Sequence, residues 1–351
     1  MISVIIPLYN KSSTVCRTVA TILQQTYKDF ELIIVDDGST DGGLDLLKSH
    51  FNDNRIRYIS KANSGVSATR NLGVKESRGD WVAFLDADDL WLPTYLEEMA
   101  GMITRNPDAD MVGCASYGVY FGSNVVHTNR MIDKYYGKEG RINYFMCMDS
   151  MSHIGATCIS KDVFNRIGGF DVNVRNNEDI LLMAKIALEG NYIYLGKMLH
   201  VYMLDVPGQV TRDPRRRVGN MRDVLYVLNE LFSYSRNFNN KLVRSALRFR
   251  FYDYLFRFLS MGDYAMLGYF IAKVDNGLVH SHCIGWMKSP RLKFMACLYV
   301  YGVKMMWRLR GFQSRSHKSR FEAELLKQYS DNHDFLSGVD ESKGTENVKS
   351  L

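Results

Sequence analysis

The chain has 351 residues, of which 46% are hydrophobic and 23% charged, and its formal net charge is +6 at pH 7. This length and apolar content allow one large domain and a smaller second one, each with a buried core, and argue against a disordered protein. The six cysteines have no paired Cys-x-x-Cys spacing, so we expect free thiols in a reducing compartment and no disulfide framework.

Short apolar segments alternate with segments of helical spacing through the first half of the chain. The apolar segments predict buried strands at residues 2–7, 32–35 and 81–85. The segments between them predict helices at residues 13–25, 43–51 and 66–77. This order predicts an α/β domain with a parallel, doubly wound sheet. Ligands bind outside the carboxyl ends of the strands in such a sheet, so the residues that follow each strand form the candidate site.

Acidic residues directly follow the second predicted strand. Asp36 and Asp37 lie there, and the glycine-rich residues 38–43 open the next helix. A helix N-cap explains residues 39–41 without any ligand but does not explain Asp36 and Asp37. A carboxylate at the ligand edge of a sheet is a good acceptor for a base imide or a ribose hydroxyl. The chain has no Gly-x-Gly-x-x-Gly segment, which argues against a dinucleotide cofactor.

A basic residue lies on the helix predicted at residues 66–77. Arg70 is on its second turn, after the polar residues 63–65 that precede the helix. Two interpretations stay open. Arg70 makes an ordinary surface ion pair, or it lies near the ligand edge and neutralises a diphosphate or packs beside a base.

Three acidic residues, Asp86, Asp88 and Asp89, follow the strand predicted at residues 81–85. Asp86 and Asp88 are two residues apart, so in extended backbone their side chains leave the same face. Carboxylates gathered in this way repel one another and favour a hard divalent ion such as Mg²⁺ or Mn²⁺, which also bridges to phosphates. The alternative is that these residues cap a helix that begins near Pro93.

An acidic pair begins a later helix, which the sequence predicts at residues 178–189, between strand-like residues 155–160 and 191–195. Glu178 and Asp179 lie in its first turn, where the helix dipole alone makes acidic residues common. A carboxylate near a pocket can also act as a general base, because a hydroxyl that attacks must lose its proton.

Taken together and in this order, these motifs resemble those of the family 2 glycosyltransferases over residues 1–205. The matching segments are residues 7–10, 35–41, 63–71, 84–89 and 168–171, followed by Glu178 and Asp179. The resemblance implies the GT-A fold, an inverting mechanism and a nucleotide-sugar donor that is most often a uridine diphosphate sugar. It also implies Mg²⁺ or Mn²⁺ as the cofactor.

Carried over position by position, the resemblance assigns four residues to the nucleoside of the donor. Asp37 would contact the uracil, with Asp36 beside it. Pro7 and Tyr9 would line the nucleoside pocket.

The resemblance assigns the remaining candidates to the metal, the diphosphate and the acceptor. Asp86 and Asp88 would match the Asp-x-Asp pair of the family, with Asp88 nearest the metal and helped by Asp89. Asp179 would be the catalytic base. Arg70 would lie near the base and the phosphates.

The motifs also limit the activity. The processive synthases of the family carry a Gln-x-x-Arg-Trp motif, which is absent here, so we expect transfer of a single sugar to a saccharide or lipid-linked acceptor in surface polysaccharide biosynthesis. A nucleotidyltransferase is a second hypothesis, but it should carry a glycine-rich basic loop after the first strand. A third is a non-enzymatic protein that binds a membrane or nucleic acid. The joint presence of Asp37, Asp86, Asp88 and Asp179 argues against it.

The second half of the chain is basic and predicted to be helical. Residues 212–320 contain 21 Lys and Arg against 6 Asp and Glu. Helices are predicted at residues 225–232, 242–259, 264–274 and 292–309. We therefore expect a catalytic domain at residues 1–210, a helical region at 220–320 and a flexible tail at 321–351.

The charge and the apolar patterning also predict where the protein lies. No run of 18 apolar residues is present and the N-terminus lacks the pattern of a signal peptide, so we expect a cytoplasmic protein without a spanning helix. The basic helical region, rich in aromatic residues, suggests peripheral contact with the anionic inner face of the cytoplasmic membrane and no binding of nucleic acid. The alternative is that this region only packs against the catalytic domain or forms a dimer interface.

Overall fold

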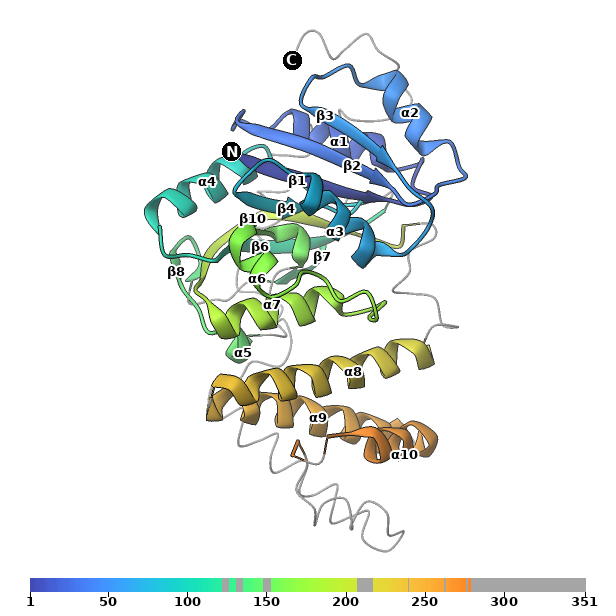
Figure 1. Ribbon diagram of the computed structural model, residues 1–351, viewed down its shortest axis with the longest axis vertical. Coiled ribbons are helices and arrows are strands. Elements are labelled where there is room, and N and C mark those ends of the chain that lie inside the picture. Colours follow the sequence, from blue (N-terminus) through green and yellow to red (C-terminus); the bar gives the residue numbers. More distant parts are fainter. Residues whose placement is uncertain are drawn as a thin grey trace, which may run out of the picture.

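The structure, a computed structural model, describes residues 1–121, 126–130, 135–147, 153–206, 217–238, 240–261, 263–275 and 277–278. One large sheet with helices on both faces forms the upper part of the molecule in Figure 1, and three helices are stacked beneath it. The predicted tail at residues 321–351 and the predicted helix at 292–309 lie outside the described residues.

The N-terminal half of the sheet is parallel. Its strands are β1 (Ile2–Leu8), β2 (Phe30–Asp36), β3 (Ile56–Ser60) and β4 (Trp81–Phe84), in the order β3-β2-β1-β4. All residues of β2 are buried, as an apolar strand covered on both faces should be. The strands predicted at residues 2–7, 32–35 and 81–85 are confirmed, and β3 is one that the apolar patterning did not predict.

The other half of the sheet is mixed, so the parallel arrangement predicted from the first half of the chain is confirmed for β1 to β4 and does not extend to the rest. It contains β9 (Thr157–Ser160), β6 (Met111–Tyr120), β10 (Tyr192–Leu204) and β5 (Leu90–Trp91), with β7 (Val126–Arg130) paired to β6 and β8 (Glu139–Arg141) paired to β10. Strand β9 runs antiparallel to both β4 and β6, and β5 runs antiparallel to β10. Apolar composition predicts that a strand is buried but does not fix its direction, which depends on neighbours distant in sequence.

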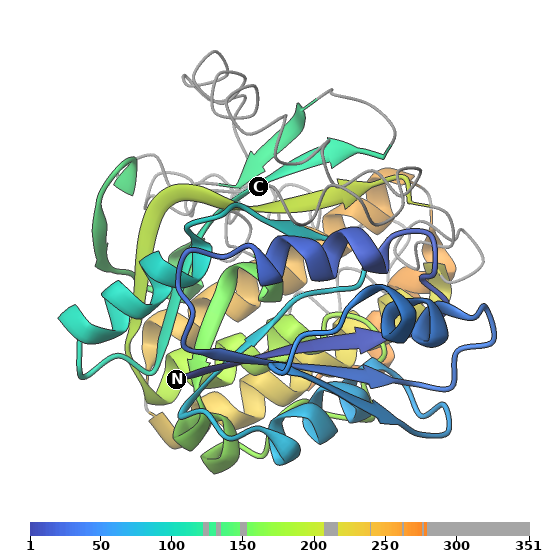
Figure 2. The ribbon, with the colours of Figure 1, turned by 90° about the horizontal axis from the view of Figure 1, so that it is seen from above.

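Helices cover both faces of the sheet. Helix α1 (Val15–Leu23) lies on one face and α3 (Val66–Glu76) on the other (Figures 1 and 2). The remaining helices of this domain are α2 (Gly43–His50), α4 (Tyr95–Arg105), α5 (Tyr144–Cys147), α6 (Lys161–Arg166) and α7 (Glu178–Glu189), with a short 3-10 turn, η2 (Ile154–Ala156). The helices predicted at residues 13–25, 43–51, 66–77 and 178–189 are therefore confirmed.

Within the described part of the C-terminal half, three helices follow the sheet. They are α8 (Arg217–Ser235), α9 (Lys241–Met261) and α10 (Tyr264–Lys273), with a 3-10 turn, η5 (Arg236–Phe238), after α8. Helix α8 lies along α7 and rests on it (Figure 1). Apolar side chains of all three helices belong to the same buried core as the sheet, including Leu228, Phe251 and Phe270. The boundary predicted at residues 210–220 falls largely on residues 207–216, which lie outside the described ranges.

No described helix is long and apolar enough to cross a lipid bilayer.

Candidate active site

The loops that follow β1 and β2 are hydrogen-bonded to each other at the carboxyl edge of the sheet. The backbone N–H of Asn10 donates to Oγ of Ser39 (3.1 Å), and the N–H of Thr40 donates to Oδ1 of Asn10 (2.8 Å). The N–H groups of Ser12 and Gly43 both donate to the Asp41 carboxylate. The N-cap of α2 is Gly42, without a side-chain cap, so the N-cap explanation for residues 39–41 was wrong. These residues are instead hydrogen-bonded to the loop after β1.

The predicted nucleoside residues lie at this same edge. Pro7 is half-buried, and Tyr9 leaves 50% of its surface exposed. Asp36 is buried and accepts a hydrogen bond from the Ser39 N–H (3.1 Å). The structure therefore brings an exposed aromatic ring and buried carboxylates to the ends of two adjacent strands.

Asp37 connects the edge to the start of α3. Its carboxylate accepts the N–H groups of Ser64 (2.8 Å) and Gly65 (2.9 Å) and forms an ion pair with Lys61. A carboxylate at a helix N-terminus is favourable because it meets unpaired N–H groups and the positive end of the helix dipole. Lys61 was not predicted as part of the site, and no local pattern marks it, because the pair spans 24 residues of sequence.

The Asp86–Asp89 segment is a tight turn, closed by the N–H of Asp89 donating to the carbonyl of Asp86 (3.0 Å). The expectation of extended backbone here was wrong. Side-chain exposure falls from 39% at Asp86 to 13% at Asp88, where Lys11 makes an ion pair of 2.7 Å. Burial raises the pKa of the Asp88 carboxyl in spite of the Lys11 ammonium. Lys11 is a second residue that the sequence did not identify.

Asp89 points to a different partner from its two neighbours. Its side chain is 3% exposed, its Oδ1 accepts the N–H of Met203 (3.0 Å), and Nε2 of His200 lies 3.2 Å from Oδ2. Burial and the charges of Asp88 and Asp86 raise the pKa of Asp89 well above its ordinary range. The carboxylate thus fastens the turn to β10. None of the three acidic residues makes a side-chain cap at α4, so the capping alternative was wrong.

Arg70 is the centre of the site, not a surface residue. Its side chain is 3% exposed, and its guanidinium is 2.6 Å from Oδ1 of Asp86 and 2.7 Å from Oε1 of Glu178. It also lies 5.2 Å from the centroid of the Phe170 ring. The two carboxylates raise the pKa of Arg70 even though burial lowers it. One buried cation therefore joins the aspartate turn to the acidic pair of α7.

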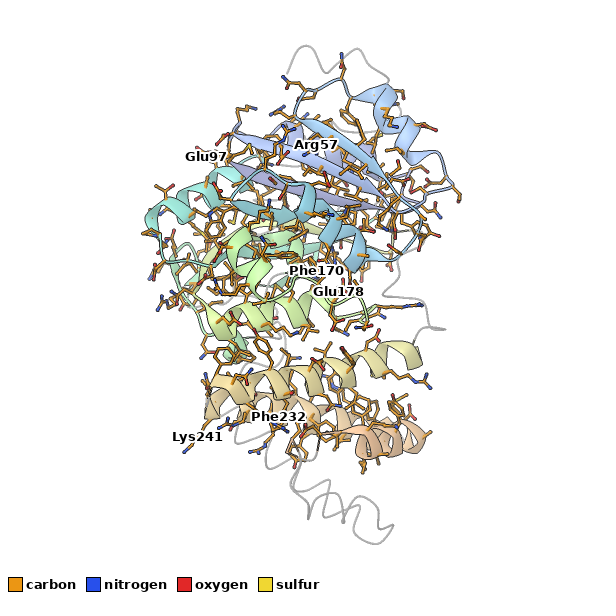
Figure 3. All side chains as sticks on the ribbon, viewed as in Figure 1. Arg57, Glu97, Phe170, Glu178, Phe232 and Lys241 are labelled. Carbon is orange, nitrogen blue, oxygen red and sulfur yellow. The ribbon has the colours of Figure 1, made fainter. Side chains whose placement is uncertain are left out.

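The acidic pair begins α7, as predicted. Figure 3 shows the labelled Glu178 and Phe170 side chains in the space between α3 and α7. Burial raises the pKa of Glu178 to about 7, opposed by Arg70 and assisted by the charge of Asp179. Asp179 is half-buried and accepts the N–H of Ile180 (2.8 Å). The Glu178 carboxylate is thus paired with Arg70, and Asp179 is less buried than Glu178.

Within the part of the chain that the structure describes, no three His, Cys, Asp or Glu side chains gather in an arrangement that could hold a metal ion. Mg²⁺ commonly binds through only one or two carboxylates and completes its shell with water and substrate phosphates. The Lys11 ammonium beside Asp88 indicates that this position favours a positive charge. Asp86 and Asp88 therefore fit a metal that is completed by a phosphate ligand.

Comparison with known proteins gives the family. Residues 3–167 match the profile described as Glycosyl transferase family 2. An uncharacterized glycosyltransferase of Rickettsia bellii is 44% identical over 105 residues, which are 30% of this chain and 15% of the relative. Glycosyltransferase GlyA of Streptococcus pneumoniae is 30% identical over 213 residues, which are 58% of this chain and 30% of the relative. The chain thus spans less than a third of either relative.

A solved structure gives the fold. The crystal structure of S. aureus TarS 1-349 in complex with UDP-GlcNAc has a TM-score of 0.63 to this chain, at 17% sequence identity, over 91% of this chain and 94% of that one. The predicted GT-A fold is confirmed by this likeness. The family itself rests on the profile match, which places residues 3–167 of this chain among the family 2 glycosyltransferases.

Proposed function

We propose that the chain transfers a single sugar, with inversion, from a uridine diphosphate sugar to a saccharide or lipid-linked acceptor. The observation that carries this proposal is the buried Arg70, which pairs with both Asp86 and Glu178. It brings the candidate donor-diphosphate turn and the candidate base next to each other, as a displacement at the anomeric carbon requires. Because TarS was solved with UDP-GlcNAc, we take that sugar as the first donor to test.

The donor nucleoside would bind at the ends of β1 and β2. An ionised carboxylate has about four lone-pair sites, so Asp37 can accept the imide N–H of uracil in addition to its present backbone partners. Asp36 would support the ribose or the base from beside it. The exposed ring of Tyr9, together with Pro7, offers an apolar surface for the base.

A Mg²⁺ or Mn²⁺ ion would be held by Asp88 and Asp86, and it would supply neutralisation of the diphosphate leaving group. Lys11 would then share or release Asp88. Asp89 is turned toward β10, so we propose that it holds the turn in place and does not ligate the metal. Arg70 keeps Asp86 oriented and adds positive charge near the phosphates.

Asp179 would take the proton of the acceptor hydroxyl. Glu178 is buried and already paired with Arg70, so we assign the role of base to Asp179, the less buried carboxylate of the pair. The transferred proton and the attacking oxygen belong to the acceptor, and the diphosphate leaves from the opposite side of the sugar ring.

The test is release of UDP from a panel of nucleotide sugars, with NMR assignment of the anomeric configuration of the product. Asp179→Asn should leave donor affinity unchanged and lower turnover by about 10²- to 10⁴-fold. Asp45→Asn is the matched control, because Asp45 is an exposed carboxylate in the first turn of α2. A separate assay with UTP and a sugar 1-phosphate tests the alternative, because release of pyrophosphate from UTP with formation of a nucleotide sugar would identify a nucleotidyltransferase. Full turnover in Asp179→Asn would move the base elsewhere.

A further inference from the structure

The loop at residues 171–177 leads directly into the acidic pair of α7 and is held on one side by α3. The side chain of Asn71 donates to the carbonyl of Phe170 (2.8 Å) and accepts its N–H (2.9 Å). Further along, Oγ of Ser67 donates to the carbonyl of Val174 (3.3 Å). Helix α3 also carries Arg70, so one helix fixes both the start of this loop and the partner of Glu178.

The other side of the loop is held by α8. Oδ2 of Asp223 accepts both the backbone N–H of Asn176 (3.1 Å) and its side-chain amide (2.9 Å). The hydroxyl of Tyr226 donates to Oδ2 of Asp171 (2.9 Å). Burial and the Asp171 carboxylate raise the pKa of Tyr226 to about 12, so the hydroxyl remains a donor at neutral pH. Both residues lie beyond the segment that matches the family, which ends at residue 167.

The backbone between these contacts and Asp179 is constrained. Asn177, the N-cap of α7, has φ 66°, in the left-handed region that non-glycine residues seldom adopt. Such a conformation persists where the surrounding structure over-determines it. The hydrogen bonds of Asn176 to Asp223 are immediately before it in the chain.

We propose that α8 belongs to the catalytic apparatus: Asp223 and Tyr226 are positioning residues that fix the 171–177 loop and thereby the first turn of α7, which presents Asp179. This inference rests on the proposed role of Asp179 as the base. With this role, α8 is necessary for turnover whether or not the C-terminal region contacts a membrane.

The other end of the same helix pair provides a control. The hydroxyl of Tyr234 on α8 donates to Glu189 at the end of α7, and Lys185 lies 5.3 Å from the centroid of the Tyr234 ring. Tyr234→Phe therefore removes a tyrosine–carboxylate hydrogen bond of the same kind from α8, but at the end of α7 that is far from Asp179.

The experiment compares Tyr226→Phe, Asp223→Ala and Tyr234→Phe in the full chain. We expect the first two to lower kcat by about tenfold or more, because a small displacement of a reacting group has a large effect on rate. Donor Kd should be unchanged in all three, and Tyr234→Phe should keep the wild-type kcat even if its Tm falls. Asp223→Asn keeps one acceptor oxygen for the Asn176 N–H and should restore most of kcat.

Hydrogen exchange of residues 171–180, followed by mass spectrometry, reports the positioning without an activity assay. Exchange should rise in Asp223→Ala and not in Tyr234→Phe. Unchanged exchange in Asp223→Ala, or equal losses of kcat in the two tyrosine variants, would overturn the inference. Absence of any transfer by the wild-type chain would instead count against the proposed function, since the exchange result stands by itself.

Discussion

The basic residues of the candidate site are largely buried, and each forms an ion pair with an acidic residue. Lys11 meets Asp88, Lys61 meets Asp37, and Arg70 bridges two carboxylates. Removing one member of a buried pair leaves the other charge without compensation, which costs more than the pair contributes. Substitutions here therefore affect both ligand binding and folding, and each needs a control that separates the two.

Asp37→Ala should weaken the binding of UDP by about 10- to 100-fold, because it removes a charged acceptor whose hydrogen bonds each contribute about 1.5 to 3 kcal/mol. Calorimetric titration with UDP measures the change. Asp53→Ala is the control, since Asp53 binds Arg55 at the opposite end of β3. Equal UDP affinity in Asp37→Ala and the wild type would show that the nucleoside pocket lies elsewhere.

Glu178 predicts a dependence of stability on pH. Its pKa is about 7 in the folded chain against an ordinary value of 4.5, so between these values the folded state binds a proton that the unfolded state lacks. The stabilising contribution of Glu178 to the free energy of unfolding is fully present below about pH 4.5 and is lost as the pH rises through about 7. In Glu178→Gln the free energy of unfolding should not show this loss, which is on the order of 1 to 3 kcal/mol.

Urea unfolding of wild type and Glu178→Gln between pH 5 and 8 measures the effect. The difference in unfolding free energy should change with pH in favour of the variant as the pH rises. Two curves that stay parallel over this range would contradict a raised pKa for Glu178.

Among the elements, α3 approaches β1 more closely than any side chain at residue 73 would allow. A Cβ added at Gly73 would lie 2.5 Å from Cγ2 of Ile5, which is fully buried. This close contact sets the position of α3 and with it that of Arg70, one turn earlier on the same helix. The glycine is thus required by packing between elements.

Gly73→Ala should therefore be destabilising, whereas Gly268→Ala should not. Gly268 lies on the exposed side of α10, and an added Cβ there meets no atom within 4 Å. Both changes gain about 1 kcal/mol of helix propensity, but only Gly73→Ala overpacks the core, at about 1 to 3 kcal/mol. Urea denaturation should thus show Gly73→Ala less stable than Gly268→Ala by about 1 to 3 kcal/mol. Equal stability of the two variants would mean that α3 can shift away from β1 at little cost in free energy.

At the scale of the whole molecule, the C-terminal helices are packed onto the catalytic domain. Their apolar side chains share its core, and α8 is hydrogen-bonded to the loop before α7. Helix α8 packs on α7 and helix α9 on α5, whereas α10 packs on α8 and α9. Contact with a membrane remains a proposal that rests on the basic excess of residues 212–320, part of which, including all residues after 278, lies outside the described ranges.

We predict that the full chain binds vesicles that contain anionic lipid and that salt weakens this binding. Each Lys or Arg near an anionic surface contributes about 1 kcal/mol. Substitution of Lys288, Arg291 and Lys293 by Gln should therefore lower the partition coefficient by up to about 100-fold, as measured by vesicle flotation.

An equal loss of charge on the catalytic domain is the control for this prediction. Lys48, Lys75 and Arg78 are exposed there, and their replacement by Gln should leave flotation nearly unchanged. Flotation that is indifferent to lipid charge, or that responds equally to both sets of substitutions, would leave the basic region without a membrane role.

The sequence by itself determined the elements and the motifs that follow them. Strands β1, β2 and β4 and helices α1, α2, α3 and α7 were all predictable, because apolar periodicity and the polar residues after each strand are local features. The same locality placed Asp36, Asp37, Asp86 and Asp88 at the ligand edge, since parallel strands end on the same side of the sheet.

Only the tertiary structure decided which of these side chains meet. Arg70 and Glu178 are 108 residues apart, Asp89 and Met203 are 114 apart, and Asn176 and Asp223 are 47 apart. No local pattern encodes such contacts, because they depend on how strands β9 and β10 are inserted into the sheet and how α8 packs on α7. For that reason the sequence grouped Asp89 with the metal residues, whereas the fold turns it to β10. The sequence likewise separated the C-terminal helices from the catalytic domain, whereas the fold hydrogen-bonds α8 to the loop before α7.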